Sequence, residues 1–149
     1  MTTSRLADAG YYLGSYYSAG VGTHFIDWEL VGRPFAPGRP AMLLVDTTPG
    51  HIPRLAGFSY WVRSTGPPEG FAGDADEWHE HRGLCFANGV LVEEGVVDPA
   101  TCEGSWLGGD DLWMLHAWVV PGYDNPAGVF APTNRKLCPP RRSNDAVTC

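Results

Sequence analysis

The chain has little positive charge. Of its 149 residues, ten are Lys or Arg and 17 are Asp or Glu, which gives a formal net charge of −7. Four of the basic residues stand close together near the end, at Arg135, Lys136, Arg141 and Arg142, and we expect them in a solvated tail. An acidic chain without a basic stripe repels phosphate groups, so we expect no nucleic-acid partner.

A long apolar run is also lacking. A membrane-spanning helix needs about 20 mostly apolar residues in a row, and no segment approaches that length. The opening residues, Met1 to Arg5, lack the charged and apolar regions of a signal peptide. Two locations therefore stay open, the cytoplasm and an exported form that has lost its signal, and we favour the exported form.

The four cysteines do not include a CxxC pair of the kind found in zinc ribbons. Cys85 and Cys102 flank a predicted hairpin, while Cys138 and Cys149 flank the basic tail. Both of these local pairings are sterically possible, although four cysteines allow three connectivities. Disulfides would indicate an oxidising compartment.

Turn-forming residues leave little room for long helices, because the chain contains 19 Gly and 13 Pro. Hydrophobic patterning predicts strands at residues 22–30, 41–45, 55–63, 78–86, 90–93 and 112–120, with a hairpin turn at Asn88–Gly89. We expect an all-β fold, either a jelly-roll barrel or a two-sheet sandwich. Residues 1–149 then form one domain, with an irregular aromatic lead-in at 1–20, a β domain at 22–134 and a tail at 135–149.

Three histidines in two of the predicted strands are the first candidates for a metal site. His79 and His81, in WHEHRGLC, point to the same face of a strand and can bind one ion from a rigid platform. His116 lies in the middle of the apolar run LWMLHAWVV, where a buried imidazole needs partners for its nitrogens. A metal ion is one such partner, and a backbone carbonyl is the alternative. We interpret the three as ligands of one shared metal ion.

His24 is the expected fourth member of this group. It follows a glycine in the strand-like run GTHFID, and it stays open whether it binds the ion or stands beside it. Glu29 and Tyr60 are the candidates for acid–base catalysis near the ion. His51, in a turn, is expected to be exposed and receives no role.

The ligand type restricts the metal and the function. Neutral imidazoles suit copper, zinc, nickel and iron, whereas magnesium and calcium demand oxygen ligands. We expect one divalent transition metal, copper or zinc in preference to iron. Three protein ligands leave a position open for chemistry on a small organic substrate, whereas four close the shell and indicate a noncatalytic copper or zinc protein. A binding module with structural histidines is a third alternative.

The histidine pattern resembles that of the cupins, whose jelly-roll barrel holds a metal inside. Two cupin features are missing, since Cys85 and Phe86 stand where a glutamate is expected and no PxG element precedes the last histidine. The strings GTH, WHEHRGLC and MLHAW, followed by NPAGVFAPTN, are similar to those of a poorly characterised, often exported bacterial family. This resemblance covers residues 22–134 and implies a common histidine site, but no particular reaction.

Overall fold

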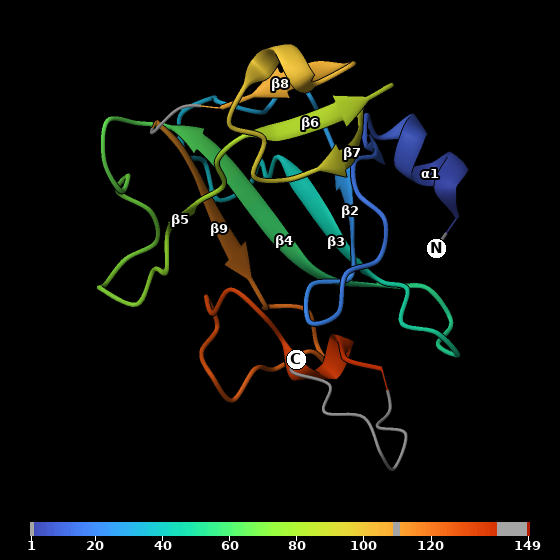
Figure 1. Cartoon of the computed structure of the whole chain (residues 1–149). Helices are drawn as coiled ribbons and strands as arrows, with labels where there is room; N and C mark the ends of the chain where they lie inside the picture. Colours follow the sequence, from blue (N-terminus) through green and yellow to red (C-terminus); the bar gives the residue numbers. More distant parts are fainter. Residues whose placement is uncertain (1, 109–110, 140–148) are drawn as a thin grey trace.

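The computed structural model describes residues 2–108, 111–139 and 149, and it consists mainly of β-strands (Figure 1). The strands are β1 (Tyr12–Leu13), β2 (Thr23–Ile26), β3 (Met42–Asp46), β4 (Arg54–Arg63), β5 (His79–Glu80), β6 (Leu84–Ala87), β7 (Val90–Glu93), β8 (Ser105–Leu107) and β9 (Leu112–Ala117). The helical elements are α1 (Thr3–Asp8) and two short 3-10 helices, η1 (Pro99–Thr101) and η2 (Arg135–Leu137). Within this described part, no helix has the length and apolarity to cross a bilayer.

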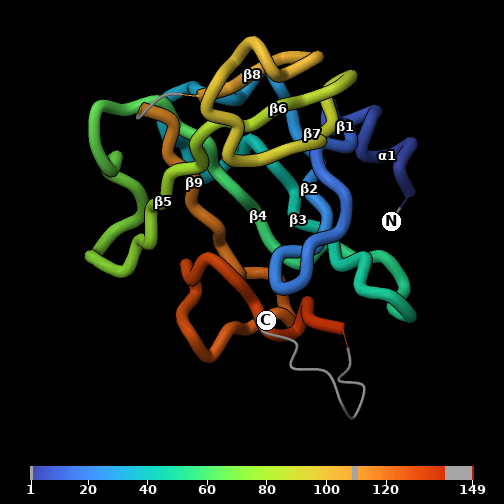
Figure 2. Tube along the Cα trace, in the orientation of Figure 1, coloured from blue at the N-terminus to red at the C-terminus, as the bar shows by residue number. Residues whose placement is uncertain are grey.

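Two antiparallel sheets are present, as the all-β prediction requires. The large sheet has the order β1-β2-β3-β4-β9-β5, and the small sheet has the order β7-β6-β8. The small sheet lies across one end of the large sheet (Figures 1 and 2). Strands β1 to β4 are neighbours in sequence order, which makes that part of the large sheet a meander. This order does not by itself define a jelly roll.

The sheets share an apolar core. Its buried members are Ile26, Ala41, Met42, Trp61, Leu84, Phe86, Leu112 and Met114. Alternate residues of a strand point to the same face, so β2, β3, β4 and β9 of the large sheet present side chains of one face to this core. The histidine site lies on the same face of the large sheet, next to this core.

The predicted strand at residues 78–86 is divided into β5 and β6, which belong to different sheets. The break falls at Gly83, whose φ of 64° is in the left-handed region and whose Cα hydrogen faces the Val96 carbonyl closely enough to exclude a side chain. The hairpin turn at Asn88–Gly89 is confirmed, and both of its residues have positive φ.

Three short elements differ from the sequence prediction. The lead-in contains helix α1 and strand β1, and strand β8 lies in a segment expected to be loop. Strand β9 ends at Ala117, because the Trp118 N–H leaves the sheet and donates to the carbonyl of Val129. Such short elements carry no periodic pattern long enough to detect.

Both local disulfide pairings are present. Cys85 on β6 is joined to Cys102 just after η1, and Cys138 after η2 is joined to Cys149. Cys85 is therefore not available as a thiolate ligand. Of the four basic residues in the predicted tail, Arg141 and Arg142 lie outside the described residues.

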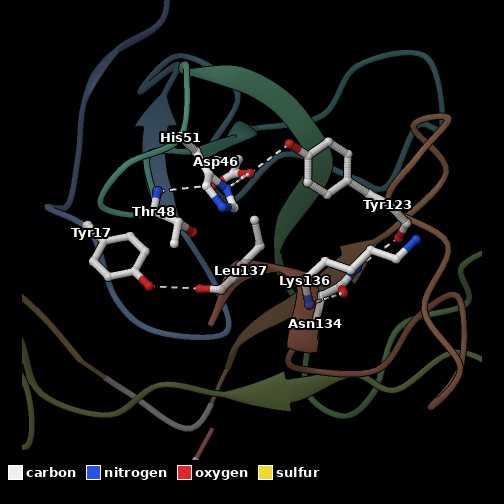
Figure 3. Close-up of polar contacts among 8 residues, drawn as sticks. All are labelled: Tyr17, Asp46, Thr48, His51, Tyr123, Asn134, Lys136 and Leu137. Carbon is white, nitrogen blue, oxygen red and sulfur yellow. Dashed lines mark hydrogen bonds and ion pairs between the residues drawn. The ribbon is translucent and has the colours of Figure 1, made fainter. Parts of the chain in front are cut away.

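A buried carboxylate ties the chain after β9 to the end of β3 (Figure 3). Asp46 accepts hydrogen bonds from the Thr48 N–H at 2.9 Å, from His51 Nδ1 at 3.0 Å and from the Tyr123 hydroxyl at 2.8 Å. Burial and the neighbouring Asp46 raise the pKa of Tyr123 to about 12. Asn134 extends this contact by donating to the Tyr123 carbonyl at 2.8 Å. These bonds hold the segment that forms one wall of the histidine site.

Candidate metal centre

Four of the five histidines stand together, and they are the four that the sequence indicated. His24 comes from β2, His79 from β5 and His116 from β9, while His81 follows β5 directly. Ring centres are 5.0 Å apart for His79 and His81, 5.1 Å for His79 and His116, and 5.7 Å for His24 and His116. His51 is exposed and bound to Asp46, away from this group.

The strand register explains how distant histidines reach one face of the large sheet. Residues directly opposite each other on paired strands share a face. Ile26 lies opposite Met42, Met42 opposite Ser59, and Ser59 opposite His116. Since His24 is two residues before Ile26, it points to the same side as His116. His79 joins them because it lies opposite Met114, two residues before His116.

Backbone carbonyls fix the tautomer of two histidines. His116 Nδ1 lies 2.7 Å from the carbonyl oxygen of Pro132, and His79 Nδ1 lies 3.2 Å from that of Glu77. A carbonyl oxygen only accepts hydrogen bonds, so each Nδ1 carries the hydrogen. The lone pair of each neutral ring is then on Nε2, which is the arrangement usual for metal-binding histidines.

His81 is fixed in the same way by a carboxylate, whereas His24 is not fixed. His81 Nδ1 lies 2.6 Å from Glu94 Oε1, and this carboxylate orients the ring with its lone pair on Nε2. His24 Nδ1 lies 2.9 Å from the Ser15 hydroxyl, which also receives the His24 backbone N–H at 3.3 Å. Because a hydroxyl both donates and accepts, either tautomer of His24 satisfies this contact.

The opposite nitrogens of three rings are buried without a partner. Among the residues that the structure describes, the Nε2 atoms of His24, His81 and His116 have no hydrogen-bond partner. A buried polar atom left unpaired costs on the order of 1–3 kcal/mol, so three such atoms in one place call for an explanation. In each of these rings Nδ1 has a hydrogen-bond partner and Nε2 has none in the described structure. A histidine that binds a metal ion through Nε2 needs this arrangement.

Burial also keeps the imidazoles of His24, His79 and His116 neutral at pH 7. It lowers the pKa of His24 to about 4, and the neighbouring rings of His81 and His79 add to the effect. Burial, together with His24 and His79, holds the pKa of His116 well below its usual value. The pKa of His79 is lowered as well, chiefly by burial. A neutral ring keeps the lone pair that a metal needs.

The rings are close without forming a finished ligand shell. Among the described residues, no set of three or more His, Cys, Asp or Glu side chains is arranged to hold a metal ion as it stands. With Zn–N distances of about 2.0–2.1 Å and tetrahedral angles, the ring centres of two imidazole ligands lie about 5 Å apart. The observed separations of 5.0, 5.1 and 5.7 Å fall close to this value.

A cavity of about 490 Å³ opens beside the four rings. Its apolar walls are Ile26, Met42, Trp61, Leu84, Phe86, Leu91 and Met114, which come from both sheets. Ser15, Glu93, Glu94 and Thr133 contribute polar atoms to its lining. The arrangement therefore places several imidazoles at one end of an apolar chamber.

The two expected acid–base groups lie elsewhere. Tyr60 is on β4 between Ser59 and Trp61, so it points to the opposite face of the sheet, and its hydroxyl donates to the Pro37 carbonyl at 2.8 Å. Glu29 is exposed in the turn after β2. Neither side chain lines the cavity.

The residues that support the rings were missed at the sequence level. These are Ser15, Glu77, Glu94 and Pro132. All four lie outside the strands, where no alternation indicates which way a side chain points. Their roles depend on how these irregular segments fold against the rings, which only the fold reveals.

The arrangement offers three or four nitrogen lone pairs, a hydrogen-bonded carboxylate behind one of the rings and an apolar chamber in front of them. This chemistry is characteristic of a transition-metal site rather than of a hydrolytic triad. Comparison with known proteins gives no match among family models, curated proteins or solved structures.

Proposed function

We propose that this protein binds a single transition-metal ion through His79, His81 and His116, with His24 as a fourth ligand or an immediate neighbour. The observation that carries the proposal is the division between the two nitrogens of the rings. Each Nδ1 has a hydrogen-bond partner, while the Nε2 atoms of His24, His81 and His116 are buried and have no partner in the described part of the chain. The proposal requires side-chain rotations that bring these atoms to a common point.

Copper or zinc fits this ligand set best, and iron is the next choice. Imidazole nitrogens suit all three metals, but iron centres with two histidines commonly add a carboxylate. The Glu94 carboxylate accepts a hydrogen bond from His81 Nδ1, and Cys85 is joined in a disulfide. The proposed shell therefore contains nitrogen only. Such a shell excludes magnesium and calcium, which require oxygen ligands.

The cavity supports an enzyme acting on a small organic molecule. A bound metal with an open position supplies Lewis acidity, an activated water or redox chemistry. The chain contributes the rest: Glu94 orients His81, the apolar walls exclude water, and the open side of the site faces the chamber. His24 and Ser15 form a hydrogen-bonded pair at the edge of the site, in place to accept or pass on a proton.

A noncatalytic copper or zinc protein is the second candidate. The buried, unpaired Nε2 of His24 favours it, because a fourth nitrogen closes a tetrahedral shell. Exchangeable water on the metal distinguishes the two functions, since a closed shell holds none.

We further propose that the protein is exported. We also propose that its histidine site lies within the β fold in the way that the metal site of a cupin does. The two disulfides support an oxidising compartment. The position of the histidines on the inner face of an antiparallel sheet supports the cupin comparison. A jelly-roll strand order stays a prediction.

The metal content of the whole chain, made under oxidising conditions, tests the proposal. We expect about one copper or zinc ion per chain after loading and dialysis. The double variant His79→Ala/His81→Ala should retain none. His51→Gln is the matched control, since His51 lies outside the site, and it should bind like the wild type. Full metal retention by the double variant, or no retention by the wild type, would refute the proposal.

A further inference from the structure

The cavity beside the histidines has features that restrict what can enter it. Its volume is about 490 Å³, within the range typical of small-molecule sites. The apolar side chains that line it come from both sheets, and several of them belong to the shared core. A chamber of this kind binds a ligand mainly by removing apolar surface from water.

Charge on the walls disfavours an anion. The lining includes two carboxylates, Glu93 and Glu94, and no Lys or Arg of the described chain contributes to it. In the metal-free chamber, an anion would lose hydration without gaining a cationic partner from the described lining, and it would approach negative charge.

One residue of the wall carries a hydrogen-bond donor that the described part of the protein does not use. Trp61 lines the cavity and is almost completely buried, and its Nε1–H has no acceptor within the described residues. A buried indole N–H usually has a partner. An acceptor oxygen on a ligand would provide it.

The opening also presents apolar surface. Tyr16 and Val92 line the cavity and are 70% and 60% exposed. They give an apolar ligand favourable contact before it reaches the interior. Met42 and Met114 lie further inside, and their flexible thioethers adapt to ligands of different shape.

We propose that this cavity binds an uncharged, largely apolar organic molecule carrying one hydrogen-bond acceptor oxygen. This proposal rests on the proposed metal function in one respect, which is the role of the molecule as a substrate. The affinity for the molecule comes from the cavity itself. The ligand body lies between the two sheets, and one end faces the histidines.

Three probes of nearly equal shape test the proposal on metal-free, folded protein. Methyl naphthyl ketone is uncharged and has the acceptor oxygen, naphthoate replaces the methyl group by a charged oxygen, and isopropenylnaphthalene replaces the carbonyl oxygen by a methylene group. Ligand-observed NMR titration measures their affinities. We expect the ketone to bind about tenfold or more tightly than naphthoate, and more tightly than the alkene.

Variants locate the binding to this chamber. Leu91 lines it from β7, and Leu91→Trp fills the space, so ketone affinity should fall by about tenfold or more. Leu91→Gln nearly conserves the volume of the side chain and should weaken binding through polarity. Val97→Trp is the control, because Val97 is 93% exposed and does not line the cavity. Trp61→Phe should abolish the preference for the ketone over the alkene.

The outcomes separate this proposal from the metal function. Ketone binding to a chain that retains no metal would support the cavity proposal while the metal function failed. Equal or tighter binding of naphthoate, or no ketone binding by folded wild type that does retain metal, would overturn the cavity proposal alone. Ketone affinity unchanged in both folded Leu91 variants would overturn it as well.

Discussion

At the scale of single residues, the site depends on which nitrogen of each histidine is engaged. Carbonyls at His79 and His116 and a carboxylate at His81 hold the hydrogen on Nδ1. His24 differs, because its partner is the Ser15 hydroxyl, which fits either tautomer. The first three rings therefore have the tautomer that the proposed metal site needs, whereas the tautomer of His24 is not fixed.

Glu94 should be needed for tight metal binding although it is not a ligand. Its carboxylate holds His81 Nδ1 at 2.6 Å, and loss of such a partner typically costs about 10–100-fold in metal affinity. We expect Glu94→Ala to show a loss of this size in a competition titration against a chelator. Glu93→Ala is the matched control, since Glu93 lines the same cavity but has no bond to His81, and an equal loss there would contradict the role of Glu94.

Replacing His24 should disturb the site and leave the fold intact. The remaining histidines still hold the ion in His24→Ala, so we expect metal affinity to fall by about 10–100-fold if His24 supports the shell, and by more if it is a direct ligand. Metal affinity and the spectrum of a bound cobalt or copper ion report the change, and far-UV circular dichroism checks the fold. Wild-type affinity with an unaltered spectrum would place His24 outside the site.

At the scale of elements, the alternation of side chains along a strand predicted which histidines share one face of the sheet. It did not predict where one strand ends and the next begins. His116 and His24 lie in runs long enough for their direction to be inferred, and the structure brings them together. The pair His79 and His81 was assigned to one long strand, whereas β5 ends at Glu80. The two rings still meet, at 5.0 Å, because the chain stays extended up to the turn at Gly83.

The Cys85–Cys102 disulfide should stabilise the small sheet over the cavity. It joins β6, which supplies Leu84 and Phe86 to the cavity wall, to the chain after η1. With a sequence separation of 17 residues, the chain-entropy model gives about 3 kcal/mol of stabilisation. We expect Cys85→Ser/Cys102→Ser to lower the free energy of unfolding in urea by about this amount.

Peptide mapping of the unreduced protein checks the same pairing directly. Protein made under oxidising conditions should yield the linked peptides of Cys85 and Cys102. If both thiols were free, or if the double variant unfolded at the same urea concentration as the wild type, the stabilising role of this disulfide would be wrong.

At the scale of the whole molecule, the site joins parts that the sequence keeps far apart. The four rings come from β2, β5, β9 and the residue after β5, while Pro132 reaches His116 from the segment held by Asp46 and Tyr123. The sequence indicated the four histidines that the structure brings together, because imidazoles are rare in apolar strands. It did not identify Pro132 or Ser15, because loop contacts follow from tertiary packing rather than from a local pattern.

Metal-free protein should lose stability in acid. The pKa of His24 is lowered to about 4 in the folded state from an ordinary value of about 6.5, and that of His116 is lowered well below its usual value as well. Between these values the unfolded chain binds protons that the folded chain does not, so the free energy of unfolding falls as pH drops from about 6.5 to about 4. Urea unfolding at a series of pH values measures this, and His24→Gln should flatten the dependence. Stability independent of pH across this window would contradict neutral, buried histidines.

The most direct test of the metal site is X-ray absorption spectroscopy of the zinc- or copper-loaded chain. A site formed by His79, His81, His116 and His24 predicts a first shell of nitrogen without sulfur. The outer shells should show the scattering characteristic of three or four imidazole rings. His79→Ala/His81→Ala should lose this signal, while His51→Gln should keep it. A first shell containing sulfur, or only oxygen without imidazole scattering, would contradict a histidine metal centre.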